Sequence, residues 1–74
     1  MSLQQKLGLT IIKLRKEIGL SQEKFALEAD IDRRYMSDLE NGRRNPSLEI
    51  IEKIAKRLGI SISDLFSEVE KNSK

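Results

Sequence analysis

Apolar residues recur at intervals of three and four along most of this chain, which is the spacing of one face of an α-helix. The first such stripe comprises Leu3, Leu7, Ile11, Leu14 and Ile18, and it predicts a helix over about residues 3–17. A second stripe comprises Leu48, Ile51, Ile54, Ala55 and Leu58. No segment shows the alternation of apolar and polar residues that indicates a half-buried strand. The pattern therefore predicts an all-α fold.

Residues that favour helix ends divide the chain into five short helices. Side chains able to cap a helix N-terminus precede the second to fifth helices, at Ser21, Asp32, Ser47 and Ser61. Glycines that suit a helix C-terminus follow the first, third and fourth helices, at Gly19, Gly42 and Gly59. Ser61 and Asp64 also have the spacing of a capping box. We expect one compact five-helix domain over residues 1–70 and a polar, frayed tail over residues 71–74.

The composition excludes several classes of site. The 74 residues include no Cys and no His, so neither a disulfide nor a Cys/His zinc site is available to stabilise so small a domain. The sequence also has no glycine-rich phosphate-binding loop, so we expect no enzyme activity, no metal and no cofactor. No apolar run is long enough for a membrane span, and the first residues lack the layout of a signal peptide, which favours the cytoplasm. The net charge of +2 permits nucleic-acid binding without arguing for it.

The connection between the second and third helices is very short. Only Asp30 and Ile31 separate Ala29, at the end of the second helix, from the Asp32 cap of the third. Helices joined so closely meet at a steep angle, and we expect Ile31 to pack inward at the corner. This is the helix-turn-helix arrangement, in which the second helix of the pair lies in the DNA major groove.

The third helix carries a polar face along one side. At about 100° per residue, its hydrogen-bonding residues fall within about 140° of one another; they are Arg33, Arg34, Ser37, Asp38 and Asn41. An ordinary solvated face is one explanation. Cations in the first turn of a helix, however, oppose its dipole by about 0.3–1 kcal/mol each, so the two arginines are not there for helix stability. A guanidinium group fits the O6 and N7 acceptors of guanine or the oxygens of a phosphate, which favours contact with DNA.

The segment "GLSQEKFALEADIDRRYMSDLENGRRNPSLEIIEKIAKRLGISISDLF" resembles the Cro/C1-type helix-turn-helix of the Xre family. The resemblance covers about residues 7–66, and it depends on the motifs "LRKEIGLSQE", "LENGRRNPSLE" and "IAKRLGIS" together. Within that family the chain looks most like the controller proteins of restriction–modification systems, with small phage-type repressors as the other likeness. Many relatives have Gly in the tight turn where this chain has Asp30, a residue type that tolerates left-handed geometry.

The resemblance implies a role for each polar residue around the third helix. It implies base contacts by Arg33, Arg34, Ser37, Asp38 and Arg44. It implies contacts with the DNA phosphate backbone by Ser21, Gln22, Tyr35, Asn41, Arg43 and Asn45. Two roles are possible for Asp38. Its carboxylate accepts a hydrogen bond from a cytosine amino group, or it forms an ion pair that holds Arg34, four residues earlier on the helix, in place. The resemblance also implies that Arg15 and Glu40 form a structural ion pair, because the corresponding residues of the family form a buried or half-buried one.

The partners implied are double-stranded DNA and a second copy of the chain. One small domain offers few base contacts, whereas a homodimer contacts two half-sites of a palindromic operator about 34 Å apart. The apolar residues in excess of one small core are candidates for the dimer interface: Ile50, Ile62, Phe66 and Val69. RNA polymerase is a further candidate partner, and no membrane is expected. The alternative is a protein-interaction module of the same fold, such as an antitoxin or anti-repressor component.

Overall fold

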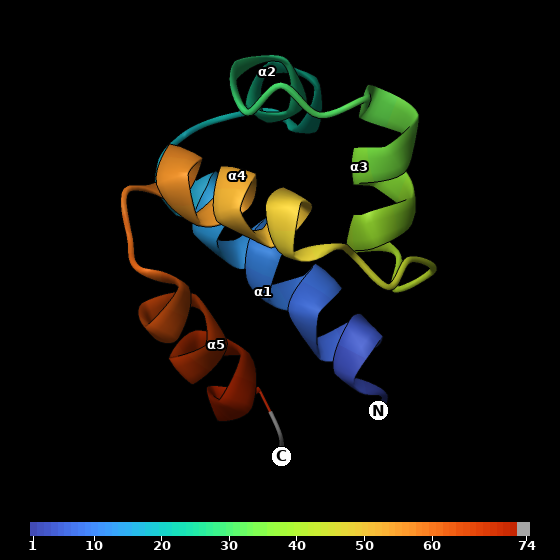
Figure 1. Cartoon of the computed structure of the whole chain (residues 1–74), viewed down its shortest axis with the longest axis vertical. Coiled ribbons are helices and arrows are strands. Elements are labelled where there is room, and N and C mark those ends of the chain that lie inside the picture. The colour runs from blue at the N-terminus through green and yellow to red at the C-terminus, as the bar shows by residue number, and fades with distance from the viewer. Residues whose placement is uncertain (73–74) are drawn as a thin grey trace.

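The computed structural model describes residues 1–72, which contain five helices (Figure 1). They are α1 (Leu3–Glu17), α2 (Gln22–Glu28), α3 (Arg33–Glu40), α4 (Leu48–Leu58) and α5 (Ile62–Lys71). α1 contacts α2, α3 and α5, and in Figure 1 α4 crosses in front of it. The predicted all-α fold is confirmed, as are the bounds of the first helix. Within the described residues, no helix has the length and apolarity needed to cross a membrane.

The predicted N-caps are confirmed. Each accepts a hydrogen bond of 2.9–3.2 Å from a backbone N–H in the first turn of its helix; they are Ser21, Asp32, Ser47 and Ser61. Within residues 1–72 the predicted capping box at Ser61 is only half formed, because Asp64 returns no bond to it. A complete capping box instead opens α1, where Ser2 Oγ accepts from the Gln5 N–H and Gln5 Oε1 accepts from the Ser2 N–H.

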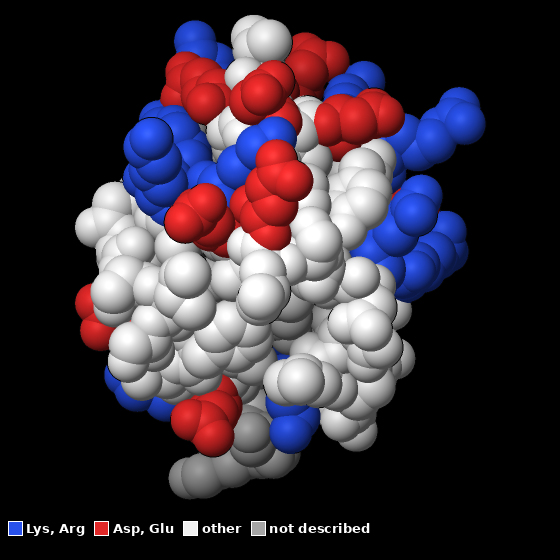
Figure 2. Space-filling model, viewed as in Figure 1, with Lys and Arg blue, Asp and Glu red and all other residues white. Residues whose placement is uncertain are grey.

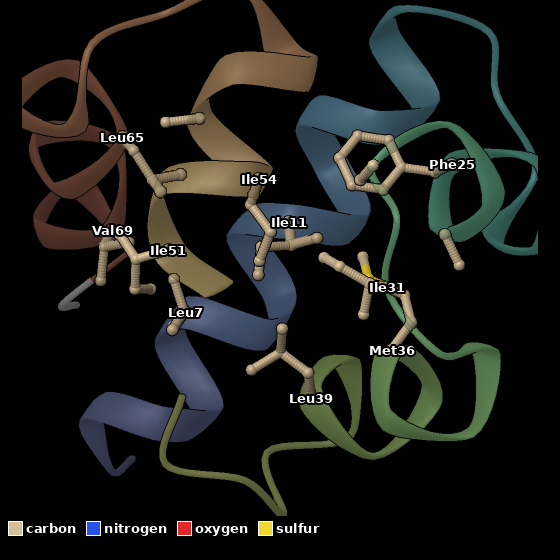
Figure 3. Packing of buried hydrophobic residues seen from close by; sticks show 13 residues of the cluster. Leu7, Ile11, Phe25, Ile31, Met36, Leu39, Ile51, Ile54, Leu65 and Val69 are labelled. Atoms are coloured by element: carbon tan, nitrogen blue, oxygen red, sulfur yellow. The ribbon is translucent and has the colours of Figure 1, made fainter. Parts of the chain in front are cut away.

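All five helices contribute to one apolar core (Figure 3). Ile11 of α1, Phe25 of α2, Met36 of α3, Ile54 of α4 and Leu65 of α5 are completely buried. Each such side chain contributes roughly 1.5–3 kcal/mol when it is removed from water, so the core is the main source of stability in a chain without covalent staples.

Three residues of the predicted apolar stripes are exposed rather than buried. Leu3, Ile18 and Leu48 have 61%, 42% and 85% of their surface accessible. The expectation that Leu48 faces inward on the fourth helix was therefore wrong. Leu3 and Leu48 are the first residues of their helices and Ile18 is a C-cap, and helix ends extend past the neighbouring elements that would cover them.

Gly8 permits a close approach between α1 and α3. A Cβ atom built at Gly8 would lie 2.5 Å from the carbonyl oxygen of Glu40 and 2.7 Å from that of Leu39. Any side chain at this position would therefore push the two helices apart. The C-terminal end of α3 is set by this contact.

The end of α5 differs from the expected frayed tail. Lys71 is the last residue of the helix, and its Nζ lies 2.8 Å from Glu68 Oε2. The side-chain amide of Asn72 donates a hydrogen bond to the hydroxyl of Thr10, a fully buried residue of α1. Asn72 is therefore held against α1, whereas the Lys71 pair is an exposed contact within α5. The rest of the expected tail, residues 73 and 74, lies outside the described part of the chain.

Candidate nucleic-acid interface

The turn between α2 and α3 has the predicted helix-turn-helix geometry. Asp30 adopts the left-handed conformation with φ of 59°, and Ile31 packs into the core. Lys53, from α4, donates a hydrogen bond of 3.1 Å to the backbone carbonyl of Asp30 and so supports the turn from outside. The sequence motif thus corresponds to a local structure that presents α3 on the surface.

Four of the five predicted base-contacting residues lie around one surface hollow. The hollow is lined by Gln22 of α2 and by Arg33, Arg34, Ser37 and Asp38 of α3. The fifth residue, Arg44, follows in the loop between α3 and α4. In Figure 2, Lys and Arg side chains project at the edge where Figure 1 places α3 and this loop. The structure therefore brings the predicted base-contacting set together on one side of the molecule.

The arginines of this surface are only weakly held. Arg33 Nη1 lies 3.2 Å from Glu23 Oε2, and both side chains are mostly exposed. Arg34 has no ion pair among the described residues. Exposed ion pairs contribute at most about 1 kcal/mol, so the side chains of Arg33 and Arg34 are able to leave these positions for a ligand.

Asp38 does not hold Arg34. Its Oδ2 instead lies 3.6 Å from Nε of Arg44, which corrects the i,i+4 alternative. The Arg44 guanidinium also lies over the ring of Tyr35, 4.8 Å from the ring centroid. Arg44 is therefore placed by two side chains of α3, an aromatic ring and a carboxylate, although it belongs to the loop.

The residues predicted to contact phosphates divide into two groups. Asn41, Arg43 and Asn45 are exposed in and before the loop after α3, and Tyr35 is half-buried beside them. Ser21 and Gln22 lie at the start of α2, where their side chains already have partners within the protein. Ser21 Oγ caps the helix, and Gln22 Nε2 donates a hydrogen bond of 2.9 Å to Glu40 Oε1. The sequence contains no local signal for the bond between Gln22 and Glu40.

Arg15 and Glu40 form a buried ion pair between α1 and α3. Arg15 Nε lies 2.8 Å from Glu40 Oε2, and Arg15 Nη2 lies 3.0 Å from Glu40 Oε1. Arg15 Nη1 also donates to the carbonyl oxygen of Leu20, at 2.8 Å, in the loop before α2. With 8% and 6% of their surface accessible, the two residues depend on each other, because either charge alone would be buried without a counter-ion.

The residues predicted for the dimer interface are not equally available. Ile62 is 44% exposed, and Ile50 and Phe66 are partly buried against the core. Val69 is completely buried, so its assignment to an interface was wrong: its side chain faces α1 and α4 in the core of its own domain. Figure 2 shows an extended uncharged surface below α4, over the region where Figure 1 places α5 and the first part of α1, whereas charged side chains cover the region of α4 itself. Leu48, which was predicted to be buried, lies on α4 and is exposed there.

Comparison with known proteins gives consistent results. The model of the helix-turn-helix family matches residues 11–65. Control protein C.MunI from Mycoplasma sp is 55% identical over 65 residues, which cover 86% of this chain and 88% of that protein. Control protein C.BamHI from Bacillus amyloliquefaciens is 54% identical over 55 residues, which cover 74% and 67%. The structure is also similar to that of the controller protein C.Esp1396I as a tetramer in complex with its natural 35 base-pair operator, with a TM-score of 0.87 and 33% identity, covering 97% and 95% of the two chains.

The turn at Asp30, the presentation of α3 and the extent of these similarities lead to one assignment: the chain belongs to the Cro/C1-type helix-turn-helix family.

Proposed function

We propose that this protein is a sequence-specific DNA-binding transcription regulator that occupies operator DNA as a homodimer, with α3 in the major groove. The observation that carries the proposal is the hollow between the start of α2 and α3, the helix that follows the tight turn. It is lined by Gln22, Arg33, Arg34, Ser37 and Asp38. Its donors and acceptors are the kind that distinguish base edges, and they are exposed on a helix of the right diameter for the groove.

Base and phosphate contacts fall to different parts of this surface. Arg33 and Arg34 are in the first turn of α3 and have the fork geometry for guanine O6 and N7. Arg43 and Asn45 are exposed in the loop after α3, where the sugar-phosphate backbone of the bound DNA would pass. Base contacts would supply specificity, and the phosphate contacts most of the salt-sensitive affinity.

The proposed dimer uses the exposed apolar residues of α4 and α5. Leu48 and Ile62 are the most exposed, and Phe66 adds a partly covered aromatic ring. A symmetric pair joined there would present two copies of α3 to successive turns of a palindromic operator. The operator-bound tetramer of C.Esp1396I supports assembly on DNA as the mode of action.

The regulator type that we propose is a restriction–modification controller, acting in the cytoplasm close to a promoter. The similarity to C.MunI and C.BamHI favours this type over a prophage repressor. RNA polymerase is the partner that such a position near a promoter would bring into contact. No catalytic step is part of this function, because the family and the relatives are regulators.

Selection of bound duplexes from a random DNA pool tests the proposal. The wild type should enrich a palindrome, and Arg33→Ala/Arg34→Ala should lose the preference at defined positions of each half-site. Lys13→Ala/Lys16→Ala is the matched control, since it removes two positive charges from the exposed side of α1 and should leave the consensus unchanged. A folded wild type that enriches no sequence would contradict the proposal and favour a protein-interaction module.

A further inference from the structure

We infer that Glu40, held in place by Arg15, is a positioning residue that orients the side-chain amide of Gln22 toward a DNA phosphate. The inference rests on the proposed function, because it concerns the way in which the same surface contacts DNA. Glu40 itself is buried and does not reach the DNA; its effect is exerted through Gln22.

Three donors meet at the Glu40 carboxylate. Arg15 donates through Nε to Oε2 and through Nη2 to Oε1, and Gln22 donates through Nε2 to Oε1 at 2.9 Å. Within the described residues, every buried side-chain nitrogen and oxygen has a hydrogen-bond partner. The carboxylate is thus a fixed acceptor on the inner side of Gln22.

The polarity of this contact decides which way the Gln22 amide faces. A carboxylate paired with arginine only accepts hydrogen bonds, so the amide nitrogen of Gln22 must face it. The flipped amide would set the Gln22 carbonyl oxygen against Oε1 of Glu40, two acceptors in contact. One N–H of the amide is used by Glu40, and the second N–H of the same nitrogen remains as a donor. A phosphate oxygen requires such a donor and would be repelled by a carbonyl oxygen.

Arg15 contributes to this orientation in two ways. Its two bonds to Glu40 fix the plane of the carboxylate, and its third bond, to the carbonyl oxygen of Leu20, fixes the backbone two residues before Gln22. One arginine therefore positions both the acceptor and the chain segment that carries the amide. Gln22 lines the hollow beside Arg33 and Arg34, so a donor fixed here lies on the proposed DNA surface.

The orientation is testable without DNA, by NMR of the side-chain amides in the full-length chain. We expect one Gln22 amide proton to be shifted downfield and to exchange slowly with solvent. Gln4 is the internal reference, because its side chain has no hydrogen-bond partner in the described part of the structure. In Arg15→Met/Glu40→Leu, both Gln22 protons should resemble those of Gln4. A Gln22 amide that already resembles Gln4 in the wild type would overturn the inference.

A double-mutant cycle then tests the effect on DNA binding, with the duplex that the wild type enriches from a random pool as the probe. The apolar pair Arg15→Met/Glu40→Leu is used because replacing both partners of a buried ion pair avoids the isolated charge that a single change leaves. Its affinity should fall about fivefold when Gln22 is present and less than about twofold in a Gln22→Ala background, and the difference between the two losses is a coupling of about 0.5–1 kcal/mol.

The outcomes of the cycle separate the possible failures. Equal losses with and without Gln22 would mean that the ion pair only supports the fold, and the positioning role would be discarded. Ile54→Val is the stability control: it weakens the core without touching the network, and the affinity of its folded form should not change. If the apolar pair does not fold, the NMR result on the wild type decides. A wild type that enriches no duplex contradicts the proposed function itself, whatever the state of the Gln22 amide.

Discussion

Replacing Gly8 with Ala should destabilise this protein, although the same change inside most helices is stabilising. Gly8 lies in the middle of α1, where Ala ordinarily gains about 0.5–1 kcal/mol over Gly. Here the added Cβ would lie 2.5 Å from the Glu40 carbonyl oxygen and 2.9 Å from its carbon. These are backbone atoms, which cannot turn aside as a flexible side chain can.

The magnitude follows from these two opposing effects. Overpacking costs about 1–3 kcal/mol, and a contact with backbone belongs at the upper end of that range. After the gain in helix propensity, the net loss is about 2 kcal/mol. For a domain of this size each kcal/mol lowers the midpoint of thermal unfolding by about 4–8 °C, so the expected decrease is about 8–16 °C.

Thermal unfolding followed by circular dichroism measures this change, and a size series identifies its cause. The loss should grow from Gly8→Ala to Gly8→Val, because α1 and α3 are forced further apart. Gly19 is the matched control. Its φ is 76° and, among the described residues other than its two chain neighbours, no atom lies within 4 Å of an added Cβ, so Ala and Ser there should cost a similar, purely conformational amount. An unchanged or raised midpoint for Gly8→Ala would refute the close-contact explanation.

Three further predictions concern the turn, the phosphate contacts and the dimer. Asp30→Gly should stabilise the protein by up to about 1 kcal/mol in urea unfolding, because φ of 59° strains a residue with a Cβ; a loss would show that the carboxylate matters more than the strain. Arg43→Ala should reduce the slope of log affinity against log salt by about 0.9 for each subunit, which is about 1.8 for the dimer, whereas Gln22→Ala should lower affinity at constant slope because Gln22 is uncharged; equal slopes for both variants would argue against a phosphate contact by Arg43. Ile62→Ser should weaken self-association in sedimentation with little effect on monomer stability, and Val69→Ala should do the reverse, since Ile62 is exposed and Val69 buried; a monomer–dimer equilibrium insensitive to Ile62→Ser would place the interface elsewhere.

The helices could be predicted because their signals are local. The caps at Ser21, Asp32 and Ser47 act on N–H groups two or three residues away, and the turn at Asp30 depends on residue type and spacing. The polar face of α3 could likewise be projected from residue intervals alone. For these features the sequence neighbours are also the physical partners.

The features that could not be predicted depend on contacts between distant segments. Gln22 meets Glu40, 18 residues away, and Gly8 meets the end of α3. Val69 is buried and Leu48 is exposed, and this difference depends on how far α5 and α4 extend past the helices that pack against them. The periodicity of apolar residues predicts which residues share a helix face, but it does not predict how much of that face another element covers.

The two ends of α3 are constrained to different degrees by the fold, and this affects how such a protein can diversify. Its C-terminal end is committed to the fold through Leu39, the Glu40 ion pair and the contact with Gly8. The exposed side chains of Arg33 and Arg34, at the other end, make no contact on which the core depends. If α3 contacts DNA as proposed, substitutions there would change the preferred DNA sequence at little cost in stability, and a duplicated gene would acquire a new operator by altering a few surface residues. The same architecture would thereby let related regulators diverge until they no longer acted on one another's promoters.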